Sequence, residues 1–130
     1  MSKLITPPPE AIVTEDDKTY TCLASYPLTH GHTVVVWKYP VSDLHLLSSA
    51  DYQHLMGVVE NVRTALLTVL NIEKVYLIYM DEIKHVHWHL VPRYNEQGIN
   101  VLKHVPEETK DFSFAEPLRL ALNDSIAGRK

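Results

Sequence analysis

The pattern of apolar and polar residues predicts strands on both sides of one long helix. Residues 32–38 read His-Thr-Val-Val-Val-Trp-Lys, the strongest run of β-branched and aromatic residues in the chain, so we expect a central strand there. Similar but shorter runs predict further strands over residues 19–24, 75–80 and 85–91. Pro92 and Arg93 are expected to end the last of these strands.

The longest periodic segment predicts a helix over residues 49–70. Its apolar residues recur at intervals of three and four and define one buried stripe: Tyr52, Leu55, Met56, Val59, Val62, Leu66, Val69 and Leu70. Ser48 and Asp51 have the spacing of a capping box at its start, and Asn71 marks its end. Strands, one long helix and then strands in hairpin-like succession favour an α+β domain built on an antiparallel sheet.

The two ends of the chain are less regular. Residues 1–18 contain three consecutive prolines, which fix φ and lack an amide donor, so we expect an extended lead-in outside the core. A single domain over residues 19–130 would follow it. Residues 98–102 predict a short strand, and a final helix is expected to be capped by Ser113 or Glu116. Its inward-facing residues would be Leu118, Ala121 and Leu122.

Composition and charge restrict the possible partners. With 130 residues, 45% of them hydrophobic and 22% charged, the chain fits one globular domain. A net charge of −4 without a basic run excludes duplex nucleic acid as an expected partner, and no apolar run approaches the length of a bilayer span. The single Cys22 cannot form an internal disulfide and no amino-terminal signal-like stretch is present, so we expect a reducing, cytoplasmic setting.

Candidate chemistry is concentrated in residues 85–91, His-Val-His-Trp-His-Leu-Val. Because successive side chains of a strand point to opposite faces, His85, His87 and His89 are expected on one face, opposite an apolar face that anchors the strand. A lone strand histidine is usually a surface or hydrogen-bonded residue. Three on one face would crowd polar rings that repel one another when protonated, which favours a functional role for the triplet.

Two chemistries fit three aligned imidazoles. Histidines at alternate strand positions can share a metal ion, with His32, Asp81 or Glu82 as further ligands. Alternatively, one neutral imidazole attacks phosphorus while its neighbours donate hydrogen bonds to the phosphoryl oxygens and the leaving group. The second chemistry needs no metal.

The sequence context of the triplet resembles a known family. The triplet fits the pattern His-φ-His-φ-His-φ-φ, where φ is apolar, and residues 27–36 (Pro-Leu-Thr-His-Gly-His-Thr-Val-Val-Val) are similar to a Pro-x-x-x-Gly-His turn that leads into a strand. Both are features of the histidine triad (HIT) superfamily of nucleotide hydrolases and transferases. The similarity extends over about residues 20–94. It implies a HIT-like fold with about five antiparallel strands, one long helix and a short carboxy-terminal helix, assembled as a homodimer.

The resemblance also implies roles for four histidines. His87 would be the nucleophile that attacks the α-phosphorus of a nucleotide conjugate, giving a nucleotidyl-histidine that water hydrolyses without metal or other cofactor. His89 would donate a hydrogen bond, or a proton, near the leaving group. His85 would orient the nucleophile, and His32 would support the triad from the neighbouring strand. The expected substrates are nucleoside phosphoramidates, adenylylated amines or dinucleoside polyphosphates.

Two departures from the family pattern concern substrate binding. Many members carry Asp or Asn at the position of Ala24, where it binds the ribose hydroxyls, whereas Ala24 has no hydrogen-bonding group and Ser25 lies next to it. The loop before the triplet contains Asp81 and Lys84 where others place a polar pair that contacts phosphate. Ser25, Asp81 and Lys84 are therefore the candidate substrate-binding residues. A protein that binds nucleotides without hydrolysing them is an alternative, as is a metalloenzyme.

Overall fold

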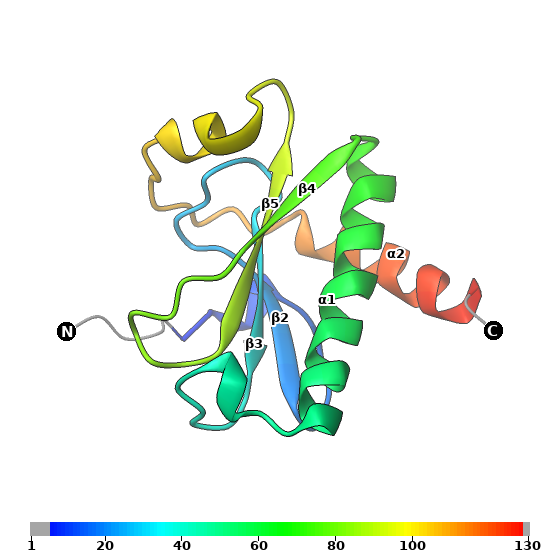
Figure 1. The fold of residues 1–130 in the computed structure, drawn as a ribbon. Coiled ribbons are helices and arrows are strands. Elements are labelled where there is room, and N and C mark those ends of the chain that lie inside the picture. Colours follow the sequence, from blue (N-terminus) through cyan, green and yellow to red (C-terminus); the bar gives the residue numbers. More distant parts are fainter. Residues whose placement is uncertain (1–5, 129–130) are drawn as a thin grey trace.

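A computed structural model describes residues 6–128 of the chain, with the side chains of residues 6–124. A five-stranded antiparallel sheet in the order β1-β2-β3-β5-β4 forms its centre (Figure 1). The strands are β1 (Ile12–Glu15), β2 (Thr19–Leu23), β3 (Thr33–Trp37), β4 (Lys74–Ile78) and β5 (His87–Arg93). The helices are α1 (Ser49–Leu70), which covers one face of the sheet, and α2 (Ala115–Gly128), which packs on α1 and β1. The predicted α+β class is confirmed.

Three predicted strands agree with β2, β3 and β4 to within two residues at each end, but the histidine strand is displaced. The prediction that Pro92 and Arg93 end it is wrong, because β5 runs through Arg93 and Pro92 pairs with Val75 of β4. Pairing of β5 with β3 stops where Thr33 meets Leu90, so the end of β5 has a partner strand on one side only. A residue without an amide hydrogen is tolerated at such a position.

The long helix begins and ends as predicted. The side chain of Ser48 accepts a hydrogen bond from the amide of Asp51 at 3.1 Å, and Asn71 ends the helix with a left-handed φ of 52°. The Asp51 carboxylate accepts a hydrogen bond from Lys18 Nζ at 2.9 Å, which ties the start of α1 to the β1–β2 turn. Tyr52 is 43% exposed and lies outside the buried stripe, which consists of Leu55, Val59, Val62, Ala65 and Leu66. No helix in residues 6–128 is long and apolar enough to cross a bilayer.

The lead-in was predicted to lie outside the core, and for its second half this is wrong. Ala11 and Val13 are fully buried, in a 3-10 turn and in edge strand β1 respectively. The guanidinium of Arg119 in α2 donates hydrogen bonds to the carbonyls of Ile12 at 2.7 Å and Val13 at 3.0 Å. Both carbonyls belong to β1, an edge strand of the sheet. β1 is therefore held by its pairing with β2 and, in addition, by a distant part of the chain.

The predicted strand over residues 98–102 is a 3-10 helix, η3 (Gly98–Lys103). Gly98 has a φ of 60°, which turns the backbone away from an extended path, and its amide donates to the hydroxyl of Tyr76 at 2.8 Å. Val101 is buried, whereas Ile99 is 80% exposed. The final helix is confirmed as α2, with Leu118 and Leu122 buried and Ala121 partly buried; Glu116 lies inside it and is not its cap.

Candidate active site

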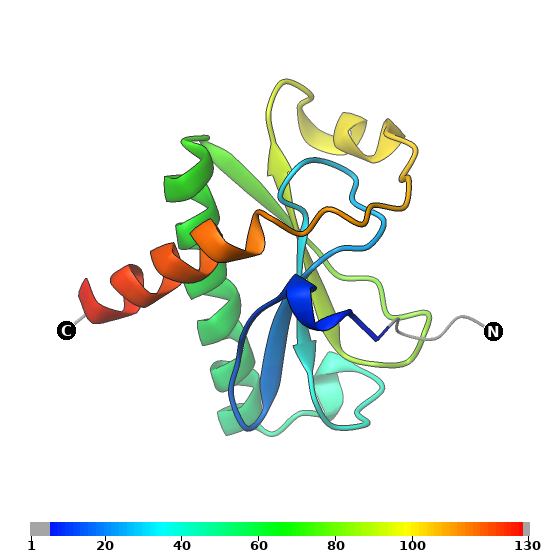
Figure 2. The same ribbon diagram turned by 180° about the vertical axis from the view of Figure 1, so that it is seen from behind.

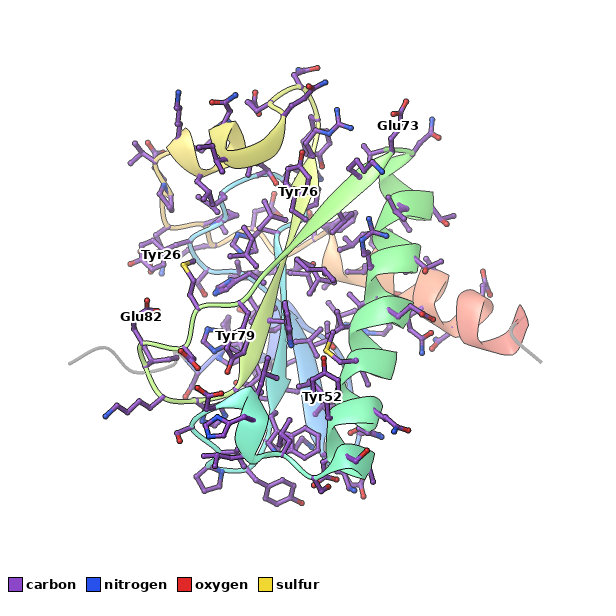
Figure 3. The ribbon with its side chains drawn as sticks, in the orientation of Figure 1. Tyr26, Tyr52, Glu73, Tyr76, Tyr79 and Glu82 are labelled. Atoms are coloured by element: carbon purple, nitrogen blue, oxygen red, sulfur yellow. The ribbon has the colours of Figure 1, made fainter. Side chains whose placement is uncertain are left out.

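The two faces of the sheet have different partners. One face packs against α1 through residues such as Val35 and Leu90, which belong to the main hydrophobic core. Side chains of the opposite face, including Val34 and Val36, form a small separate cluster with Cys22. That second face carries a cavity of about 200 Å³, on the side where Figure 3 places the labelled Tyr26 and Glu82, away from α1.

Three of the four predicted histidines line this cavity: His32, His87 and His89. His87 and His89 lie opposite Val36 and Val34 in the β3–β5 register, so the period of two places both rings on the cavity face. Trp88 and Leu90 point to the core on the other face, as expected. His85 precedes β5 and does not line the cavity.

The hydrogen bond of His87 fixes which of its nitrogens holds a proton. His87 Nδ1 lies 2.6 Å from the backbone carbonyl oxygen of His85. A carbonyl only accepts hydrogen bonds, so Nδ1 is the protonated nitrogen. In the neutral ring Nε2 then carries the lone pair. His87 is 4% exposed, and this nitrogen is the one that a nucleophile needs.

A chain of hydrogen bonds gives His89 the opposite tautomer to that of His87. The amide of Leu28 donates to His32 Nδ1 at 3.0 Å, so neutral His32 carries its proton on Nε2. His32 Nε2 donates in turn to His89 Nδ1, also at 3.0 Å. Neutral His89 must then hold its proton on Nε2. One ring therefore presents a lone pair and its neighbour, with ring centroids 5.0 Å apart, presents an N–H donor.

Burial keeps two of these rings neutral. Desolvation, and secondarily the neighbouring His89, lowers the pKa of His32 from 6.5 to about 3. Desolvation and His87 lower the pKa of His89 to about 4. Both rings are therefore uncharged at neutral pH, as the chain of hydrogen bonds requires. A neutral His89 is suited to donating a hydrogen bond to a phosphoryl oxygen rather than to giving up a proton outright.

His85 acts on the site through two contacts of its own. Its carbonyl holds His87, as described above, and its Nε2 donates to the carbonyl of Trp37 at 2.6 Å. The amide of Val86 donates to the carbonyl of Val41 at 2.9 Å. These bonds fix the backbone immediately before β5, and with it the carbonyl that determines the tautomer of His87.

The three candidate substrate-binding residues are separated by the structure. Ser25 lines the cavity, but Asp81 and Lys84 are not among its lining residues. The loop turns sharply, with the amide of Lys84 bonded to the carbonyl of Asp81 at 2.7 Å and a φ of 58° at Lys84. Ile83 is the residue of this loop that lines the cavity. The loop thus contributes an apolar side chain to the wall.

Most of the cavity wall was not predicted from the sequence. Pro7, Tyr20, Cys22 and Tyr26 line it, and none of the described lining residues is Asp, Glu, Lys or Arg. Desolvation raises the pKa of the Cys22 thiol to about 12, so the thiol stays protonated and behaves as a small apolar group. Alternation along β2 was the available signal, because residues 20, 22 and 24 must share one face of the sheet.

The histidines do not form a metal-binding arrangement. In the described part of the chain no group of three or more His, Cys, Asp or Glu side chains is placed to hold a metal ion. The facing ring nitrogens of His32 and His89 are bonded to each other, and His87 Nδ1 is bonded to a carbonyl.

Comparisons with known proteins identify the family and the fold. A model of the HIT domain family matches residues 7–96, which begins earlier than the similarity seen in the sequence and includes β1. No match to a curated protein was found. A zinc-bound histidine triad family protein from Mycobacterium smegmatis has a similar fold, with a TM-score of 0.75, 23% identity, and coverage of 94% of this chain and 90% of that one.

Two further solved structures share the fold. A hypothetical histidine triad nucleotide-binding protein from Sulfolobus tokodaii has a TM-score of 0.69 and 22% identity, covering 91% of this chain and 84% of that one. A Hit-like protein involved in cell-cycle regulation from Bartonella henselae has a TM-score of 0.72 and 19% identity, covering 87% of each chain.

Proposed function

The chain belongs to the HIT domain family, and from this premise we propose that it is a metal-independent hydrolase of nucleoside phosphate conjugates. Membership places it among nucleotide-related hydrolases and nucleotide-binding proteins. The proposed substrates are nucleoside phosphoramidates, adenylylated amines or dinucleoside polyphosphates. The observation that carries the proposal is the pair of tautomers in one cavity: the neutral His87 ring has its lone pair on Nε2, whereas the neutral His89 ring has its proton there.

The proposed reaction has two displacements at phosphorus. His87 Nε2 attacks the α-phosphorus, the bond from phosphorus to the leaving nitrogen or oxygen breaks, and the leaving group takes a proton from solvent. The His89 N–H stabilises the charge that develops on the phosphoryl oxygen. The His85 carbonyl, bonded to Nδ1, stabilises the positive charge on the phosphorylated His87 ring. Water then attacks phosphorus and loses a proton to solvent, and the bond from phosphorus to Nε2 breaks. The electron pair of that bond returns to Nε2, and the nucleoside monophosphate leaves.

Hydrolysis assays on chelator-treated protein test this function. The substrates are an adenosine phosphoramidate, its guanosine counterpart and diadenosine tetraphosphate. His87→Ala should lower turnover by about 10³-fold or more, because no other group replaces the nucleophile. The matched control is His104→Ala. His104 is exposed and pairs with Glu96, and it does not line the triad cavity, which is the cavity lined by His32, His87 and His89. Full activity of a folded His87→Ala protein would refute the mechanism, and loss of activity on chelation alone would favour a metalloenzyme.

A second candidate function is nucleotide binding without hydrolysis. It is favoured by the uncharged lining of the triad cavity and by Ala24, which provides only a methyl group there. Calorimetry would detect this function as nucleotide binding by a protein that turns over none of the three substrates.

We also propose a homodimer, as the family resemblance implies. Strand β4 is at the edge of the sheet, where its outer backbone groups have no strand partner. Leu77 on this edge is 40% exposed, and Tyr52 on α1 is 43% exposed. Light scattering at micromolar protein concentration should give twice the mass of one chain, and a monomer would contradict the proposal.

A further inference from the structure

A second cavity adjoins the triad cavity. It has a volume of about 120 Å³ and shares three wall residues with the triad cavity, namely Leu23, Ala24 and His32. Ala24 has the smallest side chain of these three. Neither cavity alone reaches the volume of about 300 Å³ at which small-molecule sites usually start, but together they do. A ligand of ordinary size at this site would therefore occupy both cavities.

The outer wall of the second cavity comes from the segment between η3 and α2, residues 104–114, which crosses the molecule in Figure 2. Alternate residues of this segment line the cavity: Thr109, Asp111 and Ser113. Phe112, between two of them, is buried in the main core. The amide of Thr109 donates to the carbonyl of Ser25 at 2.9 Å. The hydrogen bond to Ser25 and the burial of Phe112 fix the position of the segment. Its polar side chains therefore line the same cavity as Ala24.

Asp111 gives this cavity a fixed hydrogen-bond acceptor. Its Oδ1 accepts hydrogen bonds from the amide of Ser113 at 3.0 Å and from the Ser113 hydroxyl at 2.7 Å. Its other oxygen has no hydrogen bond to a described residue. The bonds from Ser113, and the nearby His30, hold the pKa of Asp111 below its usual range, so the carboxylate is ionised at neutral pH. An ionised carboxylate only accepts hydrogen bonds, so its partner in a ligand must be a donor such as a hydroxyl.

We propose that the second cavity binds the sugar hydroxyls of the nucleotide conjugate and that Asp111 accepts their hydrogen bonds. A volume of about 120 Å³ holds about four water molecules. The hydroxyl-bearing edge of a pentose would displace these waters. The phosphate would remain in the triad cavity, beside the residues Ala24 and His32 that line both cavities. Asp111 is then the residue that makes the site select ribose over sugars without hydroxyls. This inference rests on the proposed nucleotide function.

Calorimetric titration with adenosine monophosphate and its 2′,3′-dideoxy analogue tests the inference, with the guanosine pair as a second series. Wild-type protein should bind the ribose form about tenfold or more tightly, as expected for hydrogen bonds to a charged group. Asp111→Asn should reduce that preference to about threefold or less, because the amide keeps one oxygen for Ser113 but replaces the other with a donor. Glu108→Gln is the matched control, since Glu108 is exposed on the same segment and does not line the cavity.

A second substitution separates loss of recognition from loss of structure. Ala24→Asp in the Asp111→Asn protein places a carboxylate on the wall that both cavities share, and it should restore part of the ribose preference. An unchanged preference in the folded Asp111→Asn protein would overturn the inference while leaving the nucleotide function intact. Absence of binding to either monophosphate by the wild-type protein would overturn both.

Discussion

Acidification should destabilise the protein through His32, because the folded state resists protonation of this ring. His32 is 5% exposed, and burial lowers its pKa from 6.5 to about 3. In the unfolded chain the ring takes up a proton near pH 6.5, but in the folded protein it does so only near pH 3. The stability that neutral His32 contributes is therefore complete above pH 6.5 and is lost progressively as the pH falls from 6.5 towards 3.

The size of the effect follows from the proton uptake of the two states. At pH 5, which is about 1.5 units below the pKa of an unfolded histidine, protonation stabilises the unfolded chain by about 2 kcal/mol at this single site. Folded His32 is still almost entirely neutral at this pH, so the full amount is subtracted from the free energy of unfolding. His89 acts in the same direction, because its pKa in the folded state is lowered to about 4.

Urea unfolding at pH 7 and pH 5 measures this loss in wild type and in His32→Gln. Glutamine does not titrate and retains both a donor and an acceptor for the contacts with His89 and Leu28. The pH-dependent loss should be about 2 kcal/mol smaller in His32→Gln than in wild type. His104→Gln, at an exposed position, should lose as much as wild type. Equal losses in wild type and His32→Gln would refute the reasoning, because they would show that unfolding at pH 5 does not add a proton to His32.

Four further substitutions test the backbone and the core. Gly31→Ala should lower the free energy of unfolding by about 1–3 kcal/mol and also reduce activity, because Gly31 has a φ of 88° and a Cβ there would lie 3.0 Å from Leu70 Cδ1. Gly57→Ala is its counterpart within α1, where a Cβ meets nothing within 4 Å, and should raise the free energy of unfolding by about 0.5–1 kcal/mol. Leu66→Ala removes a fully buried side chain of α1 and should cost about 2–5 kcal/mol, whereas Ile99→Ala, at 80% exposure, should change stability by less than about 0.5 kcal/mol. Thermal or urea unfolding measures all four proteins, and a Gly31→Ala protein as stable as Gly57→Ala would contradict the steric argument.

Local patterns were sufficient where the structure is held by local contacts. The helix from Ser49 to Leu70 follows from its periodicity and its two end residues, and the alternation in β5 correctly places His87 and His89 together. The burial of the lead-in was not predicted in this way, because part of it depends on α2: Arg119, which donates to β1, is more than a hundred positions away in the sequence.

The candidate site likewise has one part that local patterns predict and another that they do not. Residues 20, 22 and 24 of the cavity face follow from the period of two in a strand, once the strand is identified. The wall that contains Asp111 has no such period, since residues 104–112 form neither helix nor strand. Its position depends on a bond between the Thr109 amide and the Ser25 carbonyl and on the burial of Phe112. Such contacts become visible only when the chain is folded.

The spacing of the histidines explains where the rings lie but not what each ring can do. Two identical side chains on one strand present a lone pair at His87 and a donor at His89 because two backbone groups of opposite polarity act on them. The carbonyl of His85 requires a proton on one nitrogen of His87, and the amide of Leu28, through His32, requires the reverse arrangement in His89. If the turn from Leu28 to His32 moved and the Leu28 amide no longer faced His32, neither His32 nor His89 would have a fixed tautomer. His89 could then present a second lone pair to the phosphoryl oxygens, which would repel them. The left-handed conformation of Gly31 in this turn is therefore a condition for the chemistry as well as for the fold.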